Sequence, residues 1–311
     1  MAAVAVLVAF ALCNQCSNGQ PPLEDQMVRG RGLDPKDSFT DTTVVRMSED
    51  PDEFEKYIFE NMRREGADYG VELLQNLPAD EYQEIVEVTW THAVSGQRQT
   101  YVGQIKAGDL PHGVGIGILT DGYLLEGRFE NYLQQGHVKM THPDKIGIFT
   151  GEVKDGVKHG HGTTVLSSGN KYTGEHKNGK RHGHGEYTFK IGHTYIGDWI
   201  QDAMHGTGTL YRVDGTELGG QWRDNHQDGD GYRTSPPARR QGEEDPKTVN
   251  TYKGQYKEGK QHGYGTFTWT PTSYYPKGAT YVGMWKDNQR SGYGTYTSGD
   301  GTGKEGEWAG K

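Results

Sequence analysis

Bulky apolar residues recur along the last two-thirds of the chain in a short pattern shared with glycine. Each unit begins with Tyr, Leu or Phe, and Gly follows two residues later, with a residue that is usually bulky at position +4. Positions 0, +2 and +4 point to one face of a β-strand, because successive side chains alternate between faces. The pattern predicts a strand at each start: Tyr101, Leu125, Phe149, Tyr172, Tyr195, Leu218, Tyr252, Tyr281 and, in degenerate form, Lys304.

A second strand is predicted in each unit by a Gly-x-Gly pair at positions +11 and +13. Six units have this pair in register, the first unit has it one residue late, and the second keeps only Gly136. Pairing of the two strands would lay bulky side chains over bare backbone, which offsets the cost of Gly in a strand. Position +7 is Gly, Asp or Asn in every complete unit except the second, which has Tyr132. These residue types suit tight turns, so each unit is predicted to be a β-hairpin.

The units follow one another at a nearly fixed period and predict one repeat array. Successive starts are 23 or 24 residues apart, except for gaps of 34 and 29 residues that predict surface loops within 234–250 and 271–276. The expected fold class is all-β: an elongated meander of hairpin repeats after a short, mainly helical N-terminal segment. We divide the chain into a signal-like segment (1–19), a disordered segment (20–49), a short helical cap (50–85) and the array (86–311), with eight repeats and a partial ninth.

Two short helices are predicted ahead of the array. Asp50 and Pro51 are typical of a helix start, because Asp caps free N–H groups and Pro fits the first helical position. A second helix is predicted around residues 69–77, and the alternation within 86–94 predicts the first strand. Residues 2–12 resemble the apolar core of a secretory signal, which would place the protein in the secretory pathway. The alternative is a mis-set gene start or a loose tail.

The motif Tyr-x-Gly-x-Trp followed by Gly-x-Gly resembles the MORN (membrane occupation and recognition nexus) repeat family over about residues 101–311. The resemblance implies an array of MORN β-hairpins that is not an enzyme, uses no cofactor and serves as a protein–protein scaffold or adaptor. Residues 180–185, Lys-Arg-His-Gly-His-Gly, are closest in style to radial spoke head MORN proteins. That style implies a ciliary or cytoskeletal assembly in the cytoplasm. Two alternatives are a phosphoinositide-binding membrane tether and the regulatory repeat arm of a truncated enzyme.

The charge and the cysteine content of the chain further limit the classes of partner and site that it can have. The net charge is −9, and residues 1–100 contribute −10 (8 basic and 18 acidic residues), which leaves +1 for the rest of the chain. Nucleic-acid binding depends on a basic excess, so no nucleic-acid partner is expected. Cys13 and Cys16 are the only cysteines, and the array therefore has no disulfide or thiolate metal site.

The predicted turns gather basic residues, because positions +5 to +9 of all units fall along one rim of the sheet. This rim carries eleven Lys and Arg residues against seven Asp and Glu residues. Its most basic stretch is our candidate site for anionic phospholipid or an acidic protein partner: Lys154, Lys158, Lys177, Lys180 and Arg181. The alternative is a solvated rim in which Lys side chains block unwanted strand pairing.

The histidines and glycines do not point to a metal or nucleotide site. His159 and His161 could present two imidazoles to one ion, as could His182 and His184, but His recurs at +10 in four units as part of the repeat framework. Equivalent positions lie about 9.6 Å apart, too far to share a zinc ion. Gly-x-Gly lacks the strand–loop–helix context of a nucleotide-binding loop, and no catalytic motif occurs. We therefore assign no catalytic residue and no metal site.

The partial ninth unit predicts an open strand edge. Residues 304–308 have the pattern of a first strand, with Trp308 at the aromatic position and no returning strand after it. A free edge invites pairing with another chain, so we expect Trp308 to mark an edge-pairing site, either in a homodimer or with a partner strand. The alternative is that Lys304, Glu305 and Glu307 guard the edge.

Overall fold

The structure is a computed structural model that describes residues 39–45, 68–75, 85–92, 98–106, 110–118, 123–130, 133–142, 147–236, 249–271 and 277–310. These residues fall into two compact units, one ending at Lys180 and one beginning at Arg181. The segment 1–19, the predicted helix at Asp50 and most of both predicted surface loops lie outside the described residues.

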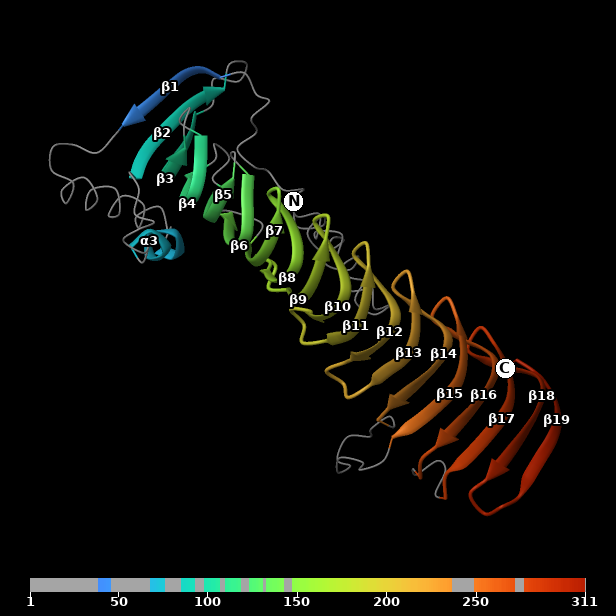
Figure 1. Cartoon of the computed structure of the whole chain (residues 1–311). Coiled ribbons are helices and arrows are strands. Elements are labelled where there is room, and N and C mark those ends of the chain that lie inside the picture. The colour runs from blue at the N-terminus through green and yellow to red at the C-terminus, as the bar shows by residue number, and fades with distance from the viewer. Residues whose placement is uncertain are drawn as a thin grey trace, which may run out of the picture. The chain divides into compact units, whose positions relative to one another are not determined.

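In the first unit each strand pairs antiparallel with the next one along the chain (Figure 1). The strands are β1 (Phe39–Val45), β2 (Ile85–His92), β3 (Arg98–Lys106), β4 (Leu110–Ile118), β5 (Leu124–Glu130), β6 (Leu133–His142), β7 (Gly147–Lys154), β8 (Val157–Val165) and β9 (Lys171–Lys177). The predicted first strand corresponds to β2. The sequence predicted disorder for 20–49, but residues 39–45 form β1, in which β-branched residues such as Thr43 and Val44 pair along β2.

The strands of the second unit, taken by itself, follow the same antiparallel order. Its strands are β10 (Lys180–Thr188), β11 (Thr194–Ile200), β12 (Ala203–Tyr211), β13 (Glu217–Arg223), β14 (His226–Ser235), β15 (Asn250–Lys257), β16 (Lys260–Trp269), β17 (Ala279–Lys286), β18 (Gln289–Ser298) and β19 (Gly303–Ala309). The predicted all-β meander of hairpin repeats is confirmed.

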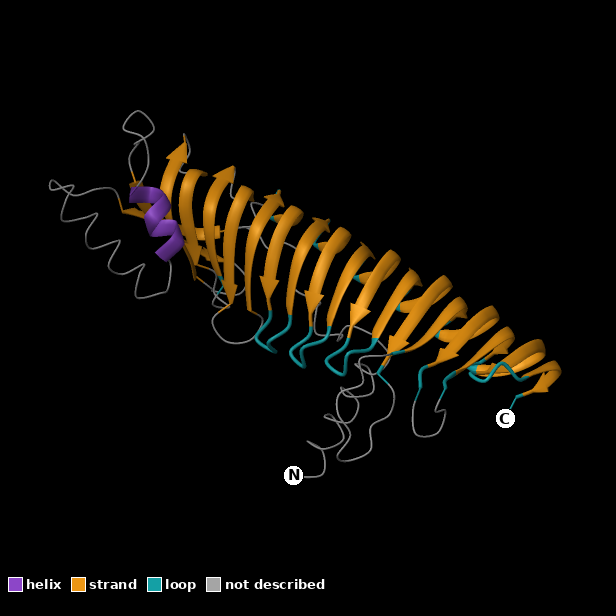
Figure 2. Ribbon diagram, turned by 90° about the horizontal axis from the view of Figure 1, so that it is seen from below, coloured by secondary structure: helices purple, strands orange, loops and turns teal. Residues whose placement is uncertain are grey.

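The hairpin tips are two-residue turns in which both residues have positive φ. Asp224 and Asn225, for example, have φ of 48° and 69°, and Asp287 and Asn288 have 50° and 68°. This conformation matches the twist of the flanking strands, and it explains the recurrence of Gly, Asn and Asp at position +7. The turns that join successive hairpins lie on the opposite side of the strands (Figure 2).

The face that carries positions 0, +2 and +4 is the buried face, which we call the inner face; the opposite, solvent-facing side is the outer face. Tyr195, Trp199 and Leu210 on the inner face are almost completely buried. The ring of Tyr195 lies against Gly208 on the paired strand, and a methyl group added there would collide with it. Tyr252 covers Gly265 and Tyr281 covers Gly294 in the same way. The predicted placement of aromatic rings on glycine is therefore confirmed.

The two glycines of each Gly-x-Gly pair have different roles. The second lies under the aromatic ring. The first has positive φ in most units, as in Gly206 (55°) and Gly263 (60°), and it lies beside a register shift between the two strands. At each of these shifts the strand with the Gly-x-Gly pair has two more residues than its partner, and the positive φ favours Gly at this bulge.

A short helix, α3 (Asp68–Gln75), packs against β4 and β5 (Figure 1). It overlaps the predicted second helix over residues 69–75 and begins one residue earlier, and Leu74 is completely buried. The neighbouring repeats carry Ile105 and Phe129 at position +4, where four of the later units carry Trp. The helix thus adds apolar cover in the part of the array that lacks the larger indole rings.

Replacement of Gly265 by Ala should destabilise the second unit, because the new methyl group would meet the Tyr252 ring. Overpacking of this kind costs about 1–3 kcal/mol. Gly303 is the matched control, since a methyl group there meets no atom closer than 3.4 Å. Chemical denaturation followed by circular dichroism should show a lower midpoint for Gly265→Ala only; equal midpoints would contradict the packing described here.

Candidate interaction surfaces

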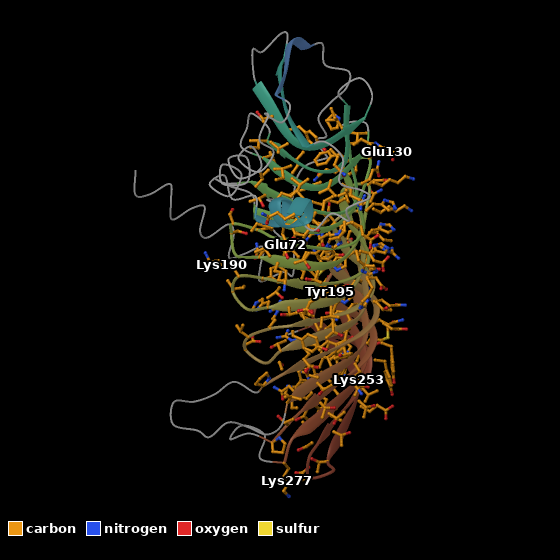
Figure 3. The ribbon with its side chains drawn as sticks, turned by 60° about the vertical axis from the view of Figure 1, so that its left-hand side comes forward. Glu72, Glu130, Lys190, Tyr195, Lys253 and Lys277 are labelled. Atoms are coloured by element: carbon orange, nitrogen blue, oxygen red, sulfur yellow. The ribbon has the colours of Figure 1, made fainter. Side chains whose placement is uncertain are left out.

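The inner face is filled by the aromatic rings of the repeats themselves. The Tyr195 ring lies edge-on between Trp199 and Trp222, with a centroid distance of 5.3 Å to each. Its hydroxyl donates to the backbone oxygen of Asp198 at 3.2 Å, and burial raises its pKa. Tyr281 lies in the same way between Trp285 and Trp308, at 5.3 and 5.4 Å. Figure 3 shows Tyr195 within the curve of the strands.

Repeats that have Trp at position +4 are also joined to the repeat before them through the indole. Trp199 Nε1 donates to the backbone oxygen of Gly185 at 3.2 Å, and Trp222 Nε1 donates to that of Gly208 at 2.9 Å. Trp285 makes the equivalent bond to Gly265 at 3.2 Å. The acceptor is always the second glycine of the preceding Gly-x-Gly pair, so one residue both accepts a ring and anchors the next repeat.

Two of the five predicted rim cations are not on the surface. Lys158 and Arg181 are only 5 % and 4 % exposed. The Lys158 ammonium lies 4.6 Å from the Phe149 ring centroid, and its Nζ donates to Thr164 Oγ1 at 3.3 Å. The Arg181 guanidinium stacks 4.5 Å from the Trp199 ring. Both residues occupy position +9, which shares the parity of the buried glycine at +13, and this parity was the signal in the sequence that could have placed them inside.

Arg181 is further held by the turn of the next hairpin. Its Nε approaches Asp202 Oδ1 at 3.3 Å, its backbone N–H donates to the same oxygen at 2.9 Å, and Nη2 donates to the Asp202 backbone oxygen at 3.0 Å. Asn225 and Asn288 accept equivalent backbone bonds from Met204 and Gln261, both at 2.9 Å. Position +7 therefore shapes its own turn and also fastens the preceding repeat.

The other three predicted rim cations, Lys154, Lys177 and Lys180, are exposed on hairpins whose turns contain Asp155 and Asn178. Asp155 is engaged by Gln135, which donates to Oδ1 at 2.7 Å. In the second unit, rim cations have acidic neighbours: Lys260 lies 3.8 Å from Asp287, and Arg223 lies 3.8 Å from Asp228. The exposed basic surface is therefore smaller than the sequence predicted, three residues rather than five in this stretch.

The outer face presents a row of side chains at positions +3 and +12, which the sequence analysis did not single out. The side-chain oxygen at +3 accepts a hydrogen bond from the backbone N–H at +12, which the bulge leaves unpaired within its hairpin. Thr207 N–H donates to Asp198 Oδ2 at 2.8 Å, and Asp230 N–H donates to Gln221 Oε1 at 2.8 Å. The recurrence of Asp, Glu or Gln at +3 was the available signal.

Histidines at +12 face acidic residues across the strands of this row. His161 pairs with Glu175, and His184 pairs with Asp198 at 3.4 Å between Nδ1 and Oδ1. Partial burial favours the neutral form of Asp198, but hydrogen bonds from Thr207 and His184 outweigh it and lower the pKa of this carboxyl group. Within the described ranges, no three His, Cys, Asp or Glu residues gather in an arrangement that could hold a metal ion.

Trp308 packs on the inner face of β19. Its Nε1 donates to the Gly294 oxygen at 3.0 Å, and the Arg290 guanidinium lies 4.4 Å from its ring centroid. Among the described strands, β19 pairs with β18 alone. The indole therefore belongs to the internal stack of the inner face.

Comparison with protein families matches the MORN repeat at residues 149–171, 172–194, 195–217, 252–273 and 281–303. The chain is a MORN-repeat protein. All five matches begin at unit starts that the sequence pattern predicted, so the resemblance to this family is confirmed. The MORN hairpin continues in the structure through the units that start at Tyr101, Leu125 and Leu218, outside those matches. A search of curated proteins gives no match.

No helix among the described residues of this MORN-repeat protein is long and apolar enough to cross a membrane.

Replacement of Arg181 by Ala should destabilise the MORN array although the residue lies beside a turn. The change removes two hydrogen bonds to Asp202 and the stacking on Trp199, and we expect a loss of about 1–3 kcal/mol. Lys177→Ala removes an exposed cation and should change stability by less than about 0.5 kcal/mol. Urea unfolding measures both; equal effects would show that Arg181 is not part of the packed interior.

Proposed function

We propose that this MORN-repeat protein is a non-enzymatic scaffold that binds other proteins through its outer face. The observation that carries the proposal is the use of the inner face in folding. Its rings, indole N–H groups and position +9 cations contact the chain itself, as Trp199 and Arg181 illustrate. The outer-face side chains are exposed in many repeats, and they recur every second strand, about 9.6 Å apart.

A periodic exposed surface suits the binding of proteins in ordered arrays, since repeat proteins use extended surfaces of stacked units for recognition. The similarity in style to radial spoke head proteins makes ciliary and cytoskeletal assemblies in the cytoplasm the partner class to test first. The charge of residues 101–311, close to neutral, favours protein over nucleic acid.

The scaffold proposal predicts that outer-face substitutions remove partners while the fold survives. Tagged full-length protein would be recovered from ciliated cells together with two outer-face variants, His161→Glu with Thr173→Arg in one unit and Ile196→Glu with Ile200→Glu in the other. All four residues are exposed or half-buried on the outer face. Quantitative mass spectrometry should show at least one stoichiometric partner reduced by about tenfold with one of these variants.

The matched control is Lys177→Ala with Lys180→Ala, which alters the rim alone. Partners should remain on this control at the wild-type level. A partner lost from the rim variant and kept by both outer-face variants would contradict binding through the outer face. Recovery of no stoichiometric protein would contradict the scaffold role.

Binding to anionic phospholipid through the rim is a second candidate, favoured by the exposure of Lys154, Lys177 and Lys180 on neighbouring hairpins. Each cation near an acidic membrane surface contributes about 1 kcal/mol, so changing all three to Glu should weaken binding to phosphatidylserine and phosphoinositide vesicles by at least about a hundredfold. Vesicle sedimentation at low salt measures this. Arg181 is left unchanged because its loss would disturb packing. Wild-type protein that ignores these vesicles at low salt would exclude the membrane role.

A further inference from the structure

At positions +3 and +12 of the outer face, the last two complete repeats carry an apolar row where the described repeats before them carry mostly polar side chains. Tyr264 on β16 is 58 % exposed, Met284 on β17 is 42 % exposed, and Tyr293 on β18 is 60 % exposed. Tyr264 lies directly opposite Met284 in the strand register. The corresponding positions of earlier repeats hold polar pairs such as His184 and Asp198. Large exposed apolar side chains grouped on one face are typical of protein–protein contacts.

Met284 also gives up a hydrogen bond that other repeats make. Position +3 normally supplies an oxygen to the bulge N–H at +12, as Gln255 does for Tyr264 at 3.0 Å. In the first unit, where the Gly-x-Gly pair comes one residue late, Gln104 does so for Val114 at +13, at 2.7 Å. A thioether has no oxygen to offer to the N–H of Tyr293. A side chain that loses a local hydrogen bond and exposes apolar surface serves folding poorly, which favours a role in binding.

A second row of outer-face residues, beside the apolar row, carries opposite charges at its two ends. In the neighbouring row of the outer face, strand register places Lys253, Thr266, Val282, Thr295 and Glu305 side by side on β15 to β19. Lys253 and Glu305 are exposed. The row is therefore basic at one end, apolar at its centre on β17 and acidic at the other end, with two strands on either side of the centre. Figure 3 labels Lys253 at the outer side of the strands.

We propose that this surface binds a second copy of the chain, outer face to outer face, about a two-fold axis that passes near Val282 and Met284. A two-fold interface uses the same patch on both copies, so a patch must complement itself after half a turn. Rotation places Lys253 of one copy against Glu305 of the other, and the reverse pair forms at the opposite end. Tyr264, Met284 and Tyr293 of one copy then pack against Tyr293, Met284 and Tyr264 of the other, as side chains do between two packed sheets.

Local geometry supports this assignment. The Tyr293 hydroxyl donates to Glu305 Oε1 at 2.8 Å, which fixes the ring beside the acidic end of the row. The proposal shares the outer face with the scaffold role and can fail independently of it, because self-association is measured on the purified chain alone. It also differs from pairing through the β19 edge, in which Lys253, four strands away, takes no part.

Sedimentation equilibrium of the purified full-length chain tests the proposal over about 1–100 μM. We expect a monomer–dimer equilibrium that Met284→Asp weakens by at least about tenfold. Lys253→Glu and Glu305→Lys should each weaken it, because each places like charges together, and the double variant should restore dimerisation by reinstating opposite charges. Such reciprocal rescue is specific to a self-complementary surface.

The control is Ile196→Asp, which adds the same charge to an exposed outer-face position outside the row. It should leave the dimer unchanged. Circular dichroism verifies that each variant is folded. Three results would overturn the proposal: wild-type protein monomeric at the highest concentration, dimerisation unaffected by Met284→Asp, or loss of the dimer on deletion of residues 304–311 with no effect of Lys253→Glu, which would assign association to the strand edge.

Discussion

The fold depends on one contact, an aromatic ring laid on the bare backbone of a paired strand. At Tyr195 the ring reaches Gly208, and any side chain at that glycine would displace it. This contact fixes strand register, because a slip by one residue would turn the ring to the opposite face. It also explains how a chain with 47 Gly residues forms a stable sheet: the glycines lose their own packing and accept that of a neighbour. The Trp222 hydrogen bond to the same Gly208 extends the arrangement to the next repeat.

The packing of rings on glycine also determines which charged side chains lie in the interior. Between the turn and the bulge, position +9 points to the inner face at the margin of the aromatic stack, where only a long side chain can cover a ring and keep its polar end bonded. Arg181 and Arg290 meet this need by stacking on Trp199 and Trp308. Gln227 does so by donating to the Gly219 oxygen at 3.0 Å. A basic residue near a turn is therefore not by itself a binding residue in this array.

Periodicity was sufficient to predict the hairpins, their turns and the rings on glycine, because each depends on spacing within one unit. The positions of Lys158 and Arg181 were not predicted, since their nearness to the turn was weighed above their parity with the buried glycine. The outer-face row was missed for another reason. Its residues vary, from His184 to Tyr264, and only the bulge shows why an oxygen at +3 bonds to position +12. β1 was missed because its partner, β2, lies far away in the sequence.

Because the inner face is fixed by packing, an array of this kind acquires new partners through changes on its outer face. Inner-face residues are bound to one another through Tyr, Trp and Gly, so substitution there disturbs two repeats at once. On the outer face the folding requirement reduces to one oxygen at +3, as Asp198 and Gln221 supply. The remaining positions can change without loss of register. Where even that oxygen is absent, as at Met284, the surface departs from what the fold requires, and such departures locate the contacts that distinguish one array from another.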